Sequence, residues 1–350
     1  MTKTLKTKTA SSRRIPGRVI LAAALYAALA VYLFWPYFNR LTLSQYILPL
    51  NFGLAATGCF VLSKRWISSF SASLLAGALY AFSPFALSFA AYHPAATIPL
   101  ALLPWLFYPA AYWQRWPAFS FLTSHNSKNR TPKRQTDILA TITTAIFSIL
   151  PLAVIVLFFI LASPIARFYP LALIELKLEN FTALAIPLAI KSHEFPFSFY
   201  HIPNIALLMG IFVYLAGLRI TTLLLFLVTL CLSFADPILS TPPVIWALTP
   251  MLFGAILIGL GLQALCWAAR PDSKWLLACT ITAAVLALAS YLAGHRHAAA
   301  MHALAALLAA IILCIANSKM RLHPLRWTLI YSLITADILL SAATIIDKIF

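Results

Sequence analysis

Acidic residues and glycine are both scarce in this 350-residue sequence, which holds eight Asp and Glu and ten Gly. So few glycines do not support phosphate-cradling loops, and no Walker, dinucleotide-binding, nucleophile-elbow or kinase motif occurs. Charged residues make up only 9% of the chain, against roughly 25% in ordinary soluble domains. The sequence therefore excludes an ordinary soluble enzyme of these classes.

Cysteine is also sparse, and the cysteines show no spacing typical of a metal or redox site. The five cysteines lie singly inside apolar stretches, at Cys59, Cys231, Cys266, Cys279 and Cys314. No C-x-x-C pair or metal-type spacing occurs among them. We expect them to be small buried hydrophobic residues, and the sequence predicts no metal site made from them.

Long apolar segments are abundant, because 62% of the chain is hydrophobic. A spanning helix needs about 20 largely apolar residues, and by this measure the sequence predicts about eleven spans, with a range of roughly 10 to 12. They are 19–37, 45–63, 69–91, 96–113, 138–162, 203–218, 220–235, 246–268, 275–293, 298–316 and 327–346. We expect an all-α, polytopic transmembrane helix bundle, with residues 19–350 as a single integral membrane domain.

The basic residues are distributed unevenly between alternate loops. All but six of the 25 Lys and Arg residues lie on one side of the predicted spans. The six on the other side are Arg40, Arg167, Lys177, Lys191, Arg296 and Lys348. Because basic residues collect in short cytoplasmic loops, the N-terminus is predicted inside and the C-terminus outside. This topology explains the net charge of +17 without a nucleic-acid partner.

Two segments on the predicted cytoplasmic side are basic and lack apolar periodicity. Residues 1–18 have the composition of an organelle transit peptide or of a cytoplasmic tail held at anionic lipid, and we favour the tail. Residues 114–137 contain SHNSKNRTPKRQT and are predicted to form a flexible basic loop.

The long extracytoplasmic loop, 163–202, is the main place where carboxylates gather. It contains Glu175, Glu179 and Glu194, and Asp236 lies in the next outer loop. Within it IELKLENF alternates apolar and polar residues, which favours an extended or interfacial stretch that covers a cavity. Glu175, Glu179 and Asp236 are the candidate catalytic residues, as a general base or as ligands of a divalent cation.

Basic side chains on the same side are candidates for binding a lipid-linked phosphate. They are Arg40, Arg167, Lys191 and His193. His193 and His201 flank the aromatic stretch FPFSFY, which is typical of a headgroup-level belt or of a surface that stacks on a sugar. The structural alternative for all these charges is ion pairing between loops or contact with lipid headgroups, and we favour it over catalysis.

Asp337 is the single acidic residue deep in a predicted span. A charge at the bilayer centre costs roughly 2.5–3.5 kcal/mol on insertion scales, so Asp337 should face the bundle interior and find a partner or water. It is a candidate for ion or proton passage, and a hydrogen-bonded structural role is equally expected. A weaker signal is the H-x-H turn of His295 and His297 with His302, which can bind zinc but is better explained as interfacial polar residues.

One region resembles a known family. Residues Ala78 to Phe85 match the pattern A-x-Y/F-A-F/L-S-P/G-F, and they are followed by His93-Pro94 and by A-L-L-P at Ala101 to Pro104. This order resembles polytopic bacterial proteins of the GT-C glycosyltransferase superfamily, in particular the YfhO-like branch. The segments FYHIPNIALLMGIFVYLAGLR and LFGAILIGLGLQAL are similar to later spans of that branch, so the resemblance covers about half of the chain.

The resemblance implies a GT-C-like core in a bacterial cytoplasmic (inner) membrane and a polyprenyl-phosphate sugar as donor. In that superfamily the catalytic acid usually lies in the first extracytoplasmic loop. Here that loop is FWPYFNRLTLSQ, which carries Asn39 and Arg40 but no Asp or Glu. Either the acid comes from Glu175, Glu179 or Asp236, or the scaffold lacks transferase activity.

Three functions are therefore open, and whether the protein is an enzyme is not decided by its sequence. The first is sugar transfer from a lipid carrier at the outer face, with no cofactor evident beyond a divalent cation. The second is a non-catalytic membrane scaffold or assembly subunit within a membrane-protein complex. The third is a transporter or flippase that uses Asp337, although a lack of repeats and of several intramembrane charges counts against it. Membrane lipids are partners in each case.

Overall fold

The described part of the chain folds into apolar helices joined by turns. The computed structural model describes residues 15–41, 43–91, 94–113, 199–200, 202–216, 230–234, 243–318 and 323–349, with single positions between 153 and 164 and at 227–228. Over these residues there is no strand, which confirms the all-α prediction. The extracytoplasmic segment IELKLENF and most of loops 114–137 and 163–202 lie outside them.

The helices follow the predicted spans closely. They are α1 Ile15–Phe34, α2 Ile47–Ser63, α3 Phe70–Ala81, α4 Pro84–Ser88, α5 Ile98–Trp113, α9 Pro203–Ala216, α11 Pro243–Trp246, α12 Leu248–Trp267, α13 Ser273–Leu292, α14 Arg296–Asn317 and α15 His323–Ile349. The predicted spans 138–162 and 220–235 lie mostly outside the described residues. Each of the other predicted spans corresponds to one helix or, for 69–91, to a broken pair.

Six helical stretches in the described residues are long and apolar enough to cross a membrane. They are Gly17–Tyr37, Phe70–Ser88, Val244–Trp267, Arg270–Leu292, Arg296–Asn317 and Pro324–Asp347. Two shorter apolar helices, Ile47–Ser63 and Pro94–Tyr108, lie beside them. Several long apolar helices of this kind are typical of a helical membrane protein.

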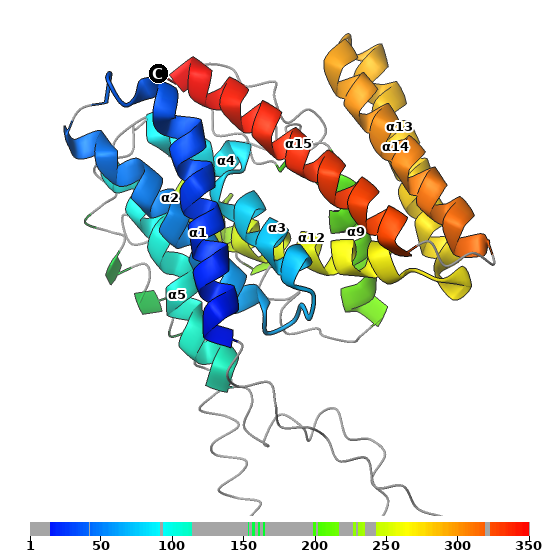
Figure 1. Ribbon diagram of the computed structural model, residues 1–350, viewed down its shortest axis with the longest axis horizontal. Coiled ribbons are helices and arrows are strands. Elements are labelled where there is room, and N and C mark those ends of the chain that lie inside the picture. Colours follow the sequence, from blue (N-terminus) through cyan, green and yellow to red (C-terminus); the bar gives the residue numbers. More distant parts are fainter. Residues whose placement is uncertain are drawn as a thin grey trace, which may run out of the picture.

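Helix α12 is the central element of the bundle. An 18-residue window of Val244–Trp267 is entirely buried, and the helix packs against α3, α9 and α15. A helix that is hydrophobic on all sides is expected at the core of such a bundle. Figure 1 shows α12 running behind α3 and α15 to the turn that begins α13.

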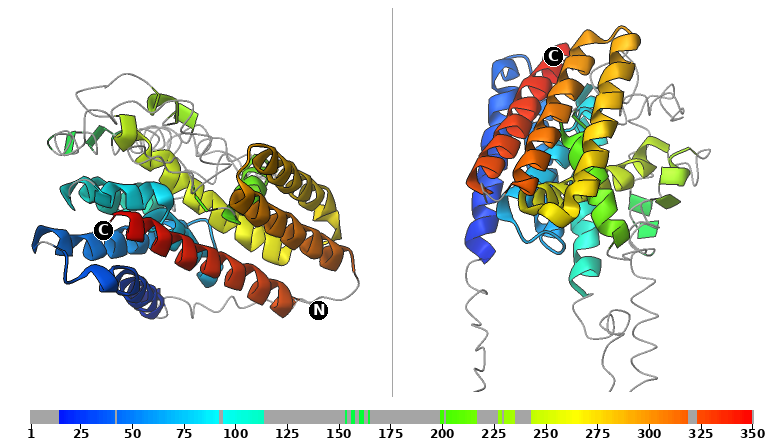
Figure 2. Two further views of the ribbon diagram at one scale, coloured as in Figure 1. Left: turned by 90° about the horizontal axis from the view of Figure 1, so that it is seen from above. Right: turned by 90° about the vertical axis from the view of Figure 1, so that its right-hand side faces the viewer.

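Helices α13 and α14 form a hairpin at the edge of the bundle. They pack along each other, and α13 also contacts α9 (Figures 1 and 2). Much of the outer surface of this hairpin is apolar and exposed, including Ile281, Val285, Leu288 and Leu307. In a bilayer these side chains would contact lipid tails.

The predicted span 69–91 is not one continuous helix. α3 ends at Ala81, and after Phe82 the side chain of Ser83 accepts a hydrogen bond from Ala86 N at 3.2 Å to begin α4, with Pro84 in its first turn. Ser is a favoured N-cap and Pro a favoured first helical residue, which explains the break. The S-P-F part of the resemblance is thus a helix break inside the bundle.

Helix ends that the charge pattern assigns to the cytoplasm meet at one end of the molecule. Lys64, just after α2, has a pKa lowered by its partial burial and by the nearby charge of Arg18 in α1. Gln263 Oε1 of α12 accepts hydrogen bonds from Ser68 N at 2.9 Å and Ser69 N at 3.0 Å, before α3. At the opposite end Tyr37 donates a hydrogen bond of 2.7 Å to Asp347. We call these the Gln263 end and the Tyr37 end.

The cysteine prediction is only partly correct. Cys59, Cys266 and Cys279 are buried, whereas Cys231 and Cys314 are exposed. Both exposed thiols lie on apolar helical segments, where hydrocarbon is the expected surrounding. In a membrane protein an apolar stretch can face lipid as well as the core, so hydrophobicity alone does not predict burial.

Candidate functional site

Asp337 lies on the inner face of α15, only 3% exposed. Its Oδ2 accepts a hydrogen bond from the backbone N–H of Ile202 at 3.1 Å, and its Oδ1 accepts one from the Ser341 hydroxyl at 3.1 Å. Ile202 immediately precedes Pro203, the first residue of α9. The carboxylate therefore lies at the positive end of the α9 dipole, where a negative charge is favourable.

Tyr200 is a second contact of the same segment with the bundle. Its side chain is fully buried, and its hydroxyl donates a hydrogen bond to the carbonyl oxygen of Phe82. That carbonyl follows the end of α3, at the break before α4, where helical carbonyls lack intrahelical partners. We call Tyr200 and Ile202 the loop anchor, because they end the long loop 163–202 and hold its last residues inside the bundle.

A small cavity also lies beside the start of α9. Asn204, Ile205 and Leu208 of α9 face four residues of α13 and His302 of α14 around a small space. The α13 residues are Cys279, Thr282, Ala283 and Leu286. His302 is only 1% exposed. Two buried ionisable residues, Asp337 and His302, therefore both lie close to the start of α9.

His295, His297 and His302 do not come together in the structure. His295 and His297 are exposed at the turn between α13 and α14, whereas His302 points into the cavity. No group of three His, Cys, Asp or Glu close enough to hold a metal ion occurs among the residues that the structure describes. The separation of His302 from the H-x-H pair follows from its position more than one helical turn into α14.

Most of the predicted site residues lie outside the described residues. These are the catalytic candidates Glu175, Glu179 and Asp236 and the phosphate-binding candidates Arg167, Lys191 and His193. Arg40 is described and lies exposed three residues after Tyr37, near the Tyr37 end. The predicted divalent cation depends on the three carboxylates, so the described residues offer no test of it.

Several polar residues of the bundle interior were not singled out from the sequence. Tyr200, Asn204 and Ser341 belong to the site, and a buried hydrogen bond of 2.7 Å joins Asn51 of α2 to Thr97. Ser341 follows Asp337 by four residues, so both lie on one face of α15. This spacing could have predicted the contact between them from the sequence. Nothing in the sequence indicated that Tyr200 would reach the break at Phe82.

The apolar helices and their buried polar contacts indicate an integral membrane protein of the helical, multi-pass class. Comparison with protein families, with curated proteins and with solved structures found no match to this chain. The GT-C resemblance therefore stays a prediction from the sequence.

Proposed function

We propose that the chain spans a bacterial cytoplasmic membrane about eleven times, with its N-terminus inside and its C-terminus outside. The distribution of basic residues supports this orientation. Arg18, Lys64 and Arg270 of the described residues all belong to helix ends on the predicted cytoplasmic side. The Tyr37 end, with Arg40 and the C-terminus of α15, is then extracytoplasmic.

We further propose that the loop 163–202 forms a working surface at the outer face, where a sugar is transferred from a polyprenyl-phosphate carrier. The loop anchor is the observation that carries this proposal. Tyr200 and Ile202 are held by Phe82 and Asp337, which belong to helices far away in the sequence. An attachment at the end of the loop would limit where its candidate residues can lie relative to the bundle, as positioning of reacting groups requires.

In this reaction Glu175, Glu179 or Asp236 would take a proton from the acceptor hydroxyl. The acceptor oxygen would form a bond to the anomeric carbon of the sugar, and the bond from that carbon to the phosphate oxygen would break. The lipid phosphate would leave with the bonding electrons. Arg40, Arg167, Lys191 and His193 would hold the phosphate through charge-assisted hydrogen bonds.

If the protein does not transfer a sugar, the position of Asp337 favours a scaffold function over a transport function. Both carboxylate oxygens accept hydrogen bonds from the protein, so its burial is explained by its role in holding the start of α9. A scaffold or assembly subunit would use the same anchor to present the loop to a partner protein. Transport would require Asp337 to exchange a proton or ion as well.

Single carboxylate substitutions distinguish the three functions. For the enzyme, Glu175→Gln, Glu179→Gln or Asp236→Asn should lower the release of sugar from lipid carriers in membrane vesicles about 10²–10⁴-fold, the usual contribution of a general base. Asp347→Asn, which changes a carboxylate at the Tyr37 end, is the matched control and should keep its activity. Membrane levels and thermal unfolding of each variant verify folding.

Other results would reject sugar transfer. Unchanged lipid-linked sugars and envelope glycans in all three variants would leave the scaffold as the better function. Loss of function in Asp337→Asn together with normal Glu175→Gln and Glu179→Gln proteins would favour transport.

A further inference from the structure

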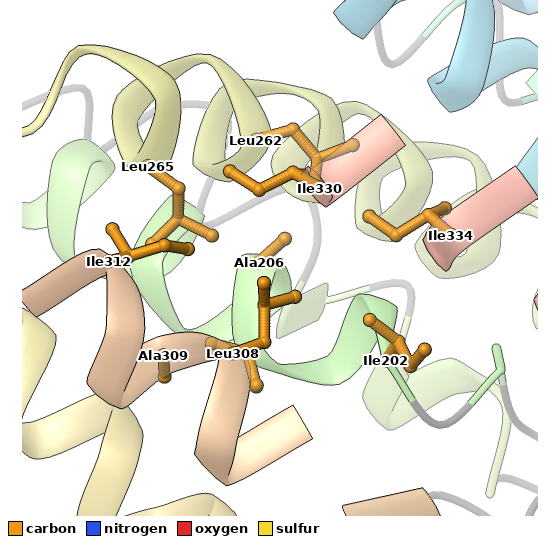
Figure 3. Close-up of a pocket in the computed structure, with 10 residues that line it drawn as sticks. Ile202, Ala206, Leu262, Leu265, Leu308, Ala309, Ile312, Ile330 and Ile334 are labelled. Atoms are coloured by element: carbon orange, nitrogen blue, oxygen red, sulfur yellow. The ribbon is translucent and has the colours of Figure 1, made fainter. Parts of the chain in front are cut away.

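Side chains fill the bundle interior between α9, α12, α14 and α15. Figure 3 shows the ten residues that line this space, and each of them is Ile, Leu or Ala and 7% exposed or less. About one water molecule would fit between them. This part of the interior therefore has no room for a larger ligand, whereas the turn that follows α1 is open to its surroundings.

The turn after α1 carries an exposed aromatic surface. Trp35 is 68% exposed and Tyr46 is 47% exposed. Phe38 contacts both of them: it meets Trp35 edge to face with ring centroids 5.8 Å apart, and it stacks on Tyr46, also at 5.8 Å. We call Trp35, Phe38 and Tyr46 the aromatic face. In the proposed orientation this face lies on the extracytoplasmic side.

Hydrogen bonds hold this turn in one shape. The Tyr46 hydroxyl donates to the carbonyl oxygen of Phe38 at 2.8 Å, which closes the turn across eight residues. The backbone N–H groups of Arg40 and Leu41 both donate to the carbonyl oxygen of Tyr37, at 2.8 Å and 3.0 Å. A surface that is already ordered loses little conformational entropy when a ligand binds to it.

Arg40 offers a positive charge on the same turn. It is exposed, and its guanidinium forms no hydrogen bond or ion pair with the residues that the structure describes. A guanidinium carries five N–H donors in a planar fork that fits a phosphate group. The exposed side chain of Asn39 lies next to Arg40 in the sequence and has an amide that can bond to hydroxyl groups. The turn thus combines a stacking surface with groups that bind an anion.

The spacing of these groups suits a sugar that carries a phosphate. Arg40 follows Trp35 by five residues in consecutive helical turns, so on the order of 8 Å separates them along the turn. A hexosyl phosphate has a comparable length. The apolar C–H groups on the faces of its sugar ring pack against the π face of an aromatic side chain, which carries negative charge density.

We propose that the aromatic face and Arg40 bind the glycosyl phosphate group of the lipid carrier, with the sugar ring on Trp35 and the phosphate on Arg40. This inference rests on the sugar transfer proposed above, and it makes the turn after α1 the place where the donor group is recognised. A headgroup-level aromatic belt would also expose Trp35. Such a belt would not distinguish a phosphate that carries a sugar from one that does not, and this difference provides the test.

Calorimetric titration of the full chain in phosphatidylcholine nanodiscs tests the role of Trp35. The two probes are geranyl glucosyl phosphate and geranyl methyl phosphate, which have the same charge and differ in the sugar. The wild type should bind the glucosyl probe about threefold or more tightly, the preference expected from one aromatic stacking contact. Trp35→Ala should remove this preference. Trp275→Ala, which removes a 45% exposed tryptophan of α13, is the control and should keep it.

A second pair of variants tests the charge. Arg40→Gln should weaken the binding of both probes about tenfold, because the charge-assisted hydrogen bonds to the phosphate are lost. Arg296→Gln removes another exposed arginine, at the start of α14, and should bind both probes as the wild type does. Thermal unfolding without a probe verifies that all four variants are folded.

Three results would overturn the proposal. Equal affinity of the wild type for the two probes would remove the sugar from the site. An equal loss of both probes in Trp35→Ala would assign Trp35 to a membrane belt. Unchanged binding in Arg40→Gln would remove the phosphate contact. Failure of sugar transfer itself is a separate result: unchanged sugar release in the carboxylate variants, with the preference for the glucosyl probe still dependent on Trp35, would support the binding surface without the reaction.

Discussion

Asp337 is the residue on which the described site depends. Its carboxylate accepts hydrogen bonds from Ile202 N–H and the Ser341 hydroxyl, at the start of α9. Pro203 has no N–H, so Ile202 N–H is the last backbone donor before the helix. Hydrocarbon offers no acceptor for such a group, and the carboxylate therefore has a structural task whether or not it also has another.

Removal of the Asp337 carboxylate should destabilise the protein. We expect Asp337→Ala to lower the free energy of unfolding by about 1–3 kcal/mol, because it leaves the buried Ile202 N–H without an acceptor. Asp337→Asn keeps one acceptor oxygen and should lie between Ala and the wild type. Thermal unfolding in detergent measures both, with Asp347→Asn as an exposed control on the same helix. An Ala variant as stable as the wild type would contradict the structural role.

At the level of elements, α9 and α12 approach each other through small residues. A Cβ on Gly261 of α12 would collide with the carbonyl oxygen of Ala206, and one on Gly210 of α9 would collide with the carbonyl oxygen of Leu257. Membrane helices gain stability from such close backbone packing because lipid provides little hydrophobic force between helices. This contact also positions the start of α9 beside Asp337.

Gly261→Ala and Gly210→Ala should separate the two helices and weaken the loop anchor. Overpacking of this kind costs typically about 1–3 kcal/mol. Gly53→Ala is the matched control, since a Cβ there meets open space. Each variant's unfolding temperature should be measured together with protease cleavage in loop 163–202. Faster cleavage in the first two variants alone is expected, and equal cleavage in all three would contradict the coupling.

At the scale of the whole molecule, the helix ends separate into two groups. Arg18, Lys64 and the Gln263 contacts lie at one end, and Tyr37 with Asp347 lies at the other. This separation is what a bundle that crosses a bilayer requires. The direction in which it crosses follows from the positive charge of the first group.

The proposed orientation can be measured with one added cysteine at a time and a membrane-impermeant maleimide on intact cells. Ala269→Cys, at the turn between α12 and α13, should react only after the membrane is opened. His297→Cys, at the turn between α13 and α14, should react in intact cells. The wild type, with its own five cysteines, is the background control. The reverse pattern would invert the proposed topology.

Helix positions could be predicted from the sequence because hydrophobic length is a local property. The span 246–268 became α12, and 298–316 became α14, within a few residues. Pro84 indicated an interruption of the segment 69–91, and the structure shows that Ser83 and Pro84 begin a new helix there. The burial of Cys314 was predicted wrongly because an apolar helix face can contact lipid.

The burial of Asp337 was expected from its charge alone, but its partners were not. Ile202 lies 135 residues away in the chain and Tyr200 reaches a carbonyl 118 residues away. Arg326 likewise read as one more basic residue of a cytoplasmic loop, whereas it is buried against Ala268. No pattern of spacing predicts contacts between segments so far apart.

The sequence by itself determined that this protein belongs in a membrane as a helical bundle and which loops carry positive charge. It could do so because the bilayer imposes a length and a polarity on each segment separately. Only the tertiary structure decided that Asp337 holds the start of α9, that Tyr200 reaches the break between α3 and α4, and that Arg326 is buried against Ala268. These features depend on how side chains of distant segments fit together, and that fit is a property of packing in three dimensions.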